Sequence, residues 1–105
     1  MTHNPIQNGT FSRRVALRQG FTTRKVGDKI FVLSQESQMH ILENRAACFL
    51  WERLEAAGSE GLTLSSLSTA LCDRFDVNQA VAQSDTLAFV ERLVGLGIVV
   101  DRKAS

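Results

Sequence analysis

The sequence contains few of the residues that disulfide frameworks, metal centres and membrane spans require. Of its 105 residues, two are cysteine, two are histidine, one is proline and none is tyrosine. Two cysteines outside a CxxC pair do not build a disulfide framework. No apolar run approaches the roughly 20 residues of a membrane-spanning helix, and the N-terminus lacks the apolar core of a signal peptide. We therefore expect a reduced, cytoplasmic protein with no membrane segment.

Side chains that carry chemistry are scattered along the chain. His3 lies in a polar N-terminal segment and His40 in an expected strand, while Cys48 and Cys72 fall beside the apolar stripes of two expected helices. Zinc requires three or four ligands at workable spacing, and a nucleophilic thiol requires a histidine base. No glycine-rich loop follows a strand to hold a phosphate. The sequence thus predicts a protein that is not an enzyme and has no cofactor or metal.

Charge is unevenly distributed, although the net charge is only +1. Residues 1–30 contain six basic residues and one acid, whereas residues 31–105 contain six basic residues and ten acids. A basic segment before an acidic body fits a nucleic-acid arm, a docking tail for an acidic partner, or a merely soluble terminus. The cations form no dense run, which favours the soluble terminus. We expect residues 1–20 to form a flexible basic lead-in outside the domain.

Three short strands are predicted after this lead-in. Residues 22–26 and 29–32 are separated by Gly27-Asp28, a two-residue signal for a tight hairpin. A polar run then separates the second strand from a third at residues 39–42. Two hairpins in series make a three-stranded antiparallel meander.

Three helices follow the strands. Asn44 and Thr63 are expected to cap the first two, which end near Gly58 and Phe75, and the third is expected over about residues 79–96. Apolar residues at helical spacing predict one shared core that contains Trp51, Leu54, Leu67, Leu71, Phe89 and Leu93.

The order of these elements predicts a single α+β domain, a three-stranded antiparallel β-meander followed by a three-helix bundle (βββααα). At this length the chain builds one core rather than two. We expect the domain to span residues 21–100 and residues 101–105 to form a tail. The apolar residues 98–100 are expected to add an extended segment or to pack on the core.

The third helix carries more apolar surface than packing on one core requires. Beside its core stripe, Leu87, Val90 and Val94 form a second apolar face at spacings i, i+3 and i+7. The sheet or the N-terminal lead-in would bury this face in one interpretation. In the other, the face lines a groove beside the free edge of the third strand. An extended peptide would add there as a strand, and the helix face would select its side chains.

Several short motifs follow one another along the three expected helices. They are Asn44, Ala47, Leu50 and Trp51 in the first helix, Thr63, Leu64 and Leu67 at the start of the second, Phe75, Asp76 and Val77 at its end, Asp85, Thr86, Phe89 and Val90 in the third, and a closing Leu93, Gly97 and Ile98. In this order, residues 21–100 resemble the PqqD-like family, which includes pyrroloquinoline quinone biosynthesis protein D and a wider group of precursor-peptide recognition domains. Glu43 and Thr86 depart from the family's pattern, which favours the wider group.

The resemblance implies a winged-helix-like, non-catalytic domain. Such domains bind the leader of a ribosomally made precursor peptide and present it to a modifying enzyme, often a radical SAM enzyme. In that family the leader adds as a strand beside the third strand and lies against the third helix. The peptide-binding residues implied here are Met39, His40, Ile41 and Leu42 on the strand and Leu87, Val90 and Val94 on the helix. A free strand edge also permits a homodimer, so the oligomeric state stays open.

A winged-helix DNA-binding regulator is the alternative function. A Thr-Leu-x-x-Leu helix start followed by a long helix is common to such regulators. A recognition helix needs basic or amide side chains that face the groove, and the third helix offers Arg92 as its only cation beside Asp85 and Glu91. The acidic body of the domain would also repel DNA. The charge pattern therefore favours the peptide binder and no nucleic-acid partner.

Overall fold

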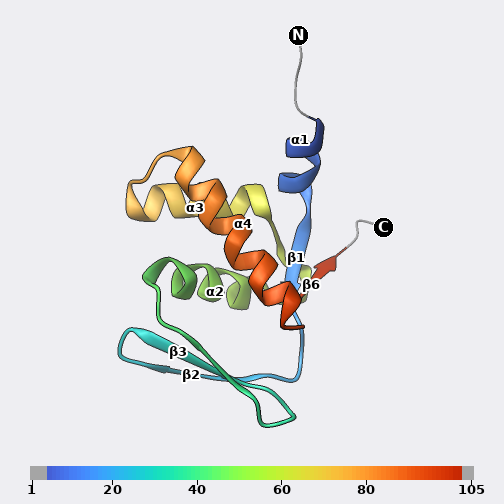
Figure 1. The fold of residues 1–105 in the computed structure, drawn as a ribbon, viewed down its shortest axis with the longest axis vertical. Helices are drawn as coiled ribbons and strands as arrows, with labels where there is room; N and C mark the ends of the chain where they lie inside the picture. Colours follow the sequence, from blue (N-terminus) through green and yellow to red (C-terminus); the bar gives the residue numbers. More distant parts are fainter. Residues whose placement is uncertain (1–4, 103–105) are drawn as a thin grey trace.

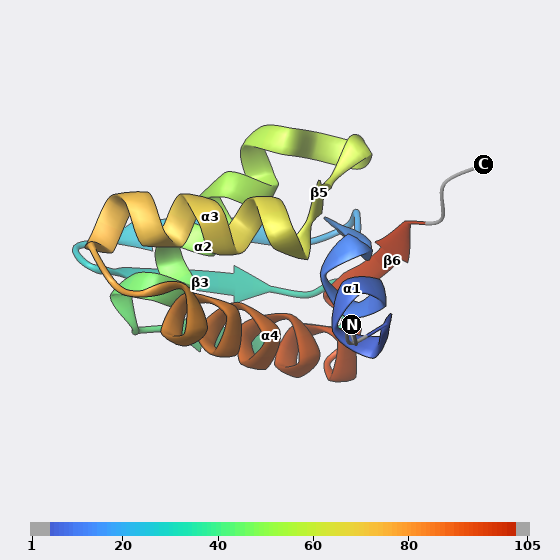
Figure 2. The same cartoon turned by 90° about the horizontal axis from the view of Figure 1, so that it is seen from above.

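A computed structural model describes residues 5–102 of the chain. Its elements are α1 (Pro5–Ser12), β1 (Arg14–Leu17), β2 (Thr22–Val26), β3 (Lys29–Leu33), β4 (Met39–Leu42), α2 (Arg45–Ala57), the 3-10 helix η1 (Gly58–Glu60), β5 (Leu62–Thr63), α3 (Leu64–Phe75), α4 (Gln79–Gly95) and β6 (Val99–Arg102). Figure 1 shows α2 above the β2–β3 hairpin, with β1 running along the side of the helices. Figure 2, the view from above, shows α3 and α4 side by side, with β3 visible between them.

The predicted meander is confirmed. Strands β2, β3 and β4 form an antiparallel sheet in that order, with Arg24 opposite Phe31 and Phe31 opposite Ile41. Gly27 has a φ of 60° in the turn between β2 and β3. This left-handed conformation favours glycine because it has no Cβ, which explains the tight hairpin.

Both predicted helix caps are also confirmed. The side chain of Asn44 accepts hydrogen bonds from the backbone N–H groups of Ala46 and Ala47, at 2.7 and 3.2 Å. The Thr63 hydroxyl accepts one from the N–H of Ser66 at 3.0 Å. These bonds satisfy backbone donors that have no partner in the first turn of a helix. They define where α2 and α3 begin.

One hydrophobic core joins the helices to the inner face of the meander. The six residues predicted to share a core, Trp51, Leu54, Leu67, Leu71, Phe89 and Leu93, all belong to it, and none is more than 8% exposed. Ile30, Val32 and Leu42 contribute from the meander. The α+β class with a meander followed by helices is therefore as predicted. None of the helices within residues 5–102 is long and apolar enough to cross a membrane.

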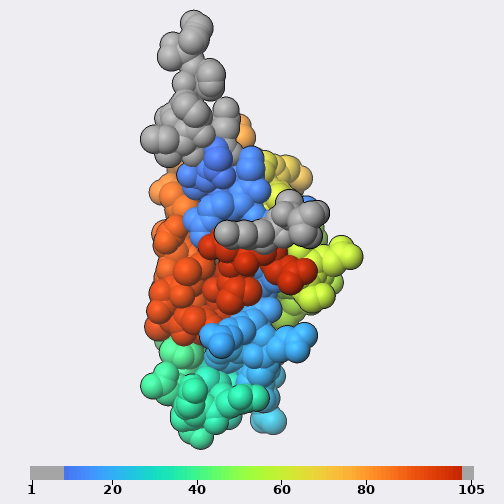
Figure 3. All heavy atoms as spheres, turned by 90° about the vertical axis from the view of Figure 1, so that its right-hand side faces the viewer, coloured from blue at the N-terminus to red at the C-terminus, as the bar shows by residue number. Residues whose placement is uncertain are grey.

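A second sheet corrects the expectation that residues 1–20 lie outside the domain. Strand β1 pairs antiparallel with β5 on one side and β6 on the other, and its Val15 and Ala16 are 0% and 2% exposed. A Cβ at Gly61 would collide with the carbonyl oxygen of Val15, so the backbones approach closely here. In Figure 3 the blue N-terminal segment lies against the red residues of α4 and β6.

The second sheet also changes the predicted domain boundaries. Strand β6 contains Asp101 and Arg102, which were expected to begin a tail, and gives the expected extended segment at Val99 and Val100, whereas Ile98 packs in the core. Residues 1–4 and 103–105 of the expected lead-in and tail lie outside the described residues. The sequence pattern missed β1 because it is only four residues long, and its partners come from segments about 48 and 85 residues away.

Candidate functional site

Strand β4 lies at the edge of the meander. It pairs with β3 from Leu33 opposite Met39 to Ile30 opposite Leu42, and within residues 5–102 no strand pairs with its other side. An unpaired edge presents backbone N–H and C=O groups that another extended chain can bond. The strand residues predicted for the site, Met39, His40, Ile41 and Leu42, all lie on this edge.

Side chains of β4 alternate between the two faces of the sheet. Leu42 is buried in the core at 1% exposure and His40 is half-buried, whereas Met39 and Ile41 are exposed on the outer face at 56% and 37%. A strand added at this edge would alternate in the same way. Every second side chain of the added strand would therefore point toward the helices.

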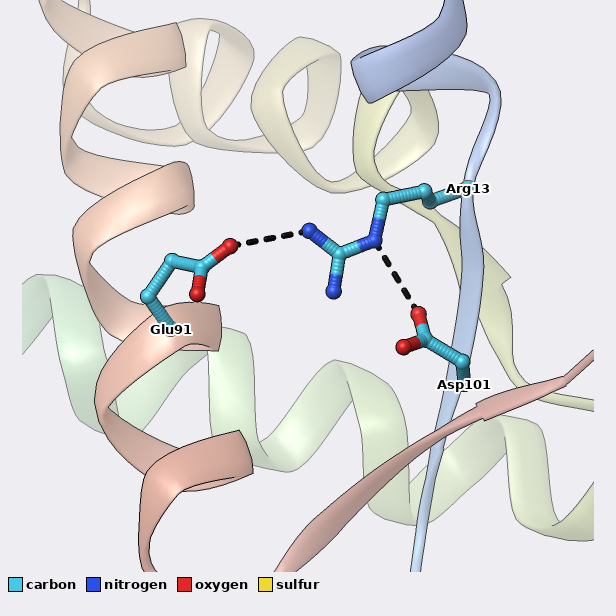
Figure 4. Close-up of polar contacts among 3 residues, drawn as sticks. All are labelled: Arg13, Glu91 and Asp101. Atoms are coloured by element: carbon cyan, nitrogen blue, oxygen red, sulfur yellow. Dashed lines mark hydrogen bonds and ion pairs between the residues drawn. The ribbon is translucent and has the colours of Figure 1, made fainter.

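The predicted helix wall lies on the flank of α4 that the N-terminal segment covers. Val90 is 0% exposed in the core, and Leu87 and Val94 are half-buried against it. Glu91 lies on the same flank, four residues after Leu87 and three before Val94. Glu91 binds Arg13, which directly precedes β1 (Figure 4). The expectation of an open apolar face is therefore wrong at Val90.

The opposite flank of α4 faces β4 and the start of α2. It carries Asp85, Ala88, Arg92 and Leu96, spaced three or four residues apart, and we call it the α4 flank. Two hollows lie along it. Each is bordered on its other side by residues of β4 or by residues adjacent to it.

The first hollow, of about 230 Å³, lies between α2 and α4. Small apolar side chains, Ala46, Ala47 and Ala88, line it together with Leu50 and Phe89. Asp85, Arg92 and the capping residue Asn44 complete the lining. The arrangement can hold an apolar side chain, with a charged group of each sign beside it. We call it the apolar hollow.

The second hollow, of about 190 Å³, is more polar. The loop between β1 and β2, the turn between β3 and β4, and the end of α4 all contribute to it. Arg18, Glu36, His40 and Leu96 are among its lining residues. We call it the polar hollow.

We take the two hollows as the two ends of one path between β4 and α4. Along the chain from β4 to α2, His40 lines the polar hollow and Asn44 the apolar hollow. Along α4 the order is reversed, because Asp85 and Arg92 line the apolar hollow and Leu96 the polar one. β4 and α4 therefore run in opposite directions beside this path, which we call the β4–α4 groove. From His40 to Asn44 an extended chain rises about 13 Å, the length of four or five residues of an added strand.

A family model described as coenzyme PQQ synthesis protein D (PqqD) matches residues 29–99, more than half of the sequence. The chain belongs to the PqqD family. The part matched to PqqD contains both walls of the β4–α4 groove, whereas α1, β1 and β2 precede it. A search of curated proteins found no match to the sequence.

Two solved structures share the fold of this PqqD-family chain. One is described as TbiB1 in complex with the TbiA(beta) leader peptide, with a TM-score of 0.71 and 14% identity over 85% of this chain and 99% of that chain. The other is lasso peptide synthetase B1 complexed with the leader peptide, with a TM-score of 0.67 and 19% identity over 83% of this chain and 98% of that chain. At these identities the comparison establishes the fold.

In this PqqD-family domain, the sequence predicted the β4 residues that border the groove but not the helix residues that border it. The missed residues are Ala88, Arg92 and Leu96 on α4, and Ala46 and Ala47 on α2. A search for large apolar residues passes over alanine. Three alanines facing one another across two helices are nevertheless a signal, because they leave space between the helices.

The thiol of Cys48 is a structural group at the junction of β4 and α2. It donates to the carbonyl oxygen of Leu42 at 3.2 Å and to that of Asp28 at 3.4 Å. Burial raises the pKa of the Cys48 thiol, and the nearby charge of Glu52 adds to the rise. A neutral, buried thiol is a poor nucleophile. Among the residues that the structure describes, no three His, Cys, Asp or Glu side chains gather as metal ligands would.

Proposed function

We propose that this chain binds the leader of a ribosomally made precursor peptide and presents it to a modifying enzyme. The leader adds as a strand to the free edge of β4 and fills the β4–α4 groove. Backbone hydrogen bonds to β4 supply affinity, and the hollows select side chains. The observation that carries the proposal is the unpaired edge of β4 beside a helix flank with two hollows.

The two similar structures support this proposal. Each is described as a complex with a leader peptide, and each is covered almost completely by its match to this chain. The groove has the length of a short strand segment, and it ends in hollows of different polarity. A leader that fits it carries an apolar side chain near the carboxyl end of β4, where Ala46, Ala47 and Ala88 leave space. A polar side chain of the leader lies near His40.

The chain acts in this proposal as a carrier and contributes no catalytic group. The chemistry belongs to the partner enzyme, for which a radical SAM enzyme is the proposed class, and both act in the cytoplasm. The buried Cys48 thiol is engaged with two backbone carbonyl groups, which does not favour a thiol mechanism.

Contacts of the basic N-terminal region do not favour the DNA-binding alternative. Arg13 donates to two carboxylates and Arg14 to two backbone carbonyl groups, while Lys25 donates to Glu52 at 2.8 Å. These are three of the six basic residues in residues 1–30, and they are engaged within the domain. On the α4 flank Arg92 and Asp85 line the same hollow, so this surface also lacks the excess of positive charge that phosphates require.

Filling the apolar hollow tests the proposal directly. Ala88→Phe places a ring in the space assigned to a leader side chain, whereas Ala80→Phe adds the same ring to an exposed position of α4 that lines neither hollow. Calorimetric titration with a precursor-peptide leader that binds the unmodified chain is expected to show at least a tenfold loss of affinity for Ala88→Phe. Ala80→Phe should bind as the unmodified chain does. Equal affinity in both variants, with unchanged melting temperatures, would place the peptide elsewhere.

A further inference from the structure

The outer face of the meander, which points away from the helices, gathers exposed apolar side chains. By the strand register it carries Val26 on β2, Phe31 and Leu33 on β3, and Met39 and Ile41 on β4. Among the residues with described burial, four of the seven exposed large hydrophobic side chains are in this set. They are Val26 at 54%, Leu33 at 38%, Met39 at 56% and Ile41 at 37% exposure. We call these five residues the outer apolar face.

Four of the five residues form one block beside the free edge of the sheet. Phe31 lies opposite Ile41, and Leu33 lies opposite Met39, so the four occupy two adjacent rows on β3 and β4. A hollow of about 450 Å³ opens beside this block and reaches β2. A contiguous apolar area with a hollow is typical of a surface that another protein covers.

Two cations border the outer apolar face on its β2 side and near the hairpin turn. Arg24 lies opposite Phe31, and Lys29 occupies the next outward position of β3. The ion pairs found within residues 5–102 involve Arg13 and Lys25, so neither Arg24 nor Lys29 is neutralised there. The outward positions of the three strands contain no acid. A second copy would therefore oppose like charges, whereas a surface with an apolar centre and acidic side chains at its rim is complementary.

We propose that the outer apolar face docks the modifying enzyme through an apolar, acid-rimmed surface of that enzyme. This inference rests on the proposed function, because a leader added to β4 would extend the same sheet. Its outward side chains would lie beside Met39 and Ile41, next to the docked enzyme. The helix side of the sheet would hold the leader, and the outer side would hold the enzyme that modifies the peptide.

Two exposed positions of nearly equal accessibility, Leu33 and Val100, provide the test. Leu33→Glu introduces a charge in the outer apolar face at a residue that is 38% exposed, on a strand that does not touch the leader edge. Val100→Glu introduces the same charge on β6, at a residue that is 37% exposed. Val26→Glu is a second face variant near the hairpin turn, in case Leu33→Glu lowers the melting temperature. Each variant is titrated with a leader that binds the unmodified chain and with the purified enzyme that modifies that precursor.

We expect Leu33→Glu and Val26→Glu to weaken enzyme binding at least tenfold and to leave leader affinity within twofold of the unmodified chain. Val100→Glu should change neither. Arg24→Glu should also weaken enzyme binding, and the enzyme affinity of the unmodified chain should fall as salt is added. Unchanged enzyme binding in both face variants would overturn the docking inference, as would self-association of the chain that Leu33→Glu abolishes. The titration with the leader tests the leader proposal independently of the titration with the enzyme. Failure of one proposal can therefore be distinguished from failure of the other.

Discussion

The guanidinium of Arg13 joins Glu91, which lies 78 residues further along the chain, through Nη1 and Oε2 at 2.9 Å. Its Nε also donates to Asp101 at 3.0 Å (Figure 4). One side chain at the start of β1 thus joins α4 to β6. Because all three groups are partly exposed, each ion pair contributes only about 0.2–1 kcal/mol. The larger effect is positional, since these contacts hold the N-terminal segment on the flank of α4 that carries Val90.

Removing residues 1–18 is therefore expected to destabilise the domain strongly. The truncation deletes β1, whose Val15 and Ala16 are buried, and leaves β5 and β6 without the strand that joins them. Thermal melting of the truncated and complete chains measures the effect. Arg13→Ala is the matched control, because it removes both ion pairs and keeps the strand, and should cost at most about 2 kcal/mol. Equal melting temperatures for the truncated and complete chains would mean that β1 contributes nothing to stability.

Val90→Asp is expected to unfold the domain. Val90 is 0% exposed, so the variant would bury a carboxylate with no partner, at a cost of several kcal/mol. Val81→Asp is the control on the same helix, because Val81 is 43% exposed and should change stability by roughly 0.5 kcal/mol or less. Urea unfolding of both variants measures the difference. A folded Val90→Asp variant of near-normal stability would restore the open face that the sequence suggested.

The Cys48 thiol is expected to make stability depend on alkaline pH. Burial raises its pKa in the folded state, while an unfolded thiol ionises near about 8.5. Its contribution to stability is therefore complete below that pH and is lost as the pH rises through the folded-state value. Urea unfolding between pH 7 and pH 10 should show a decline in the free energy of unfolding that Cys48→Ala reduces. An equal decline in the free energy of unfolding for Cys48→Ala would assign the effect to other groups.

The sequence predicted those parts of the fold that local patterns determine. The hairpin at Gly27, the caps at Asn44 and Thr63 and the helical stripes each depend on neighbours a few residues away. Strand β1 depends instead on pairing with β5 and β6, which lie far along the chain, and its four residues carry too little periodicity to reveal this. The prediction placed the binding surface on the wrong flank of α4 for the same reason. The apolar face at Val90 belongs to the core, which the N-terminal segment helps to close.

The candidate site likewise has one part that the sequence predicts and one part that it does not. The edge position of β4 follows from its being the last strand of a meander, so Met39–Leu42 could be predicted from sequence. The α4 flank depends on the rotation of α4 about its axis, which the packing of distant segments determines. Arg92 and Ala88 therefore became visible only when α4 was seen against α2 and β4.

Strand addition at β4 is tested most directly by changing the leader peptide and leaving the protein intact. A series of leader peptides, each with one backbone nitrogen methylated along the bound segment, is titrated into the unmodified chain. An added strand directs alternate N–H groups toward β4, so methylation should weaken binding at every second position over four or five residues. Positions between them should bind almost normally. Equal affinity for every methylated leader, or losses that follow a helical spacing of three to four residues, would contradict the account.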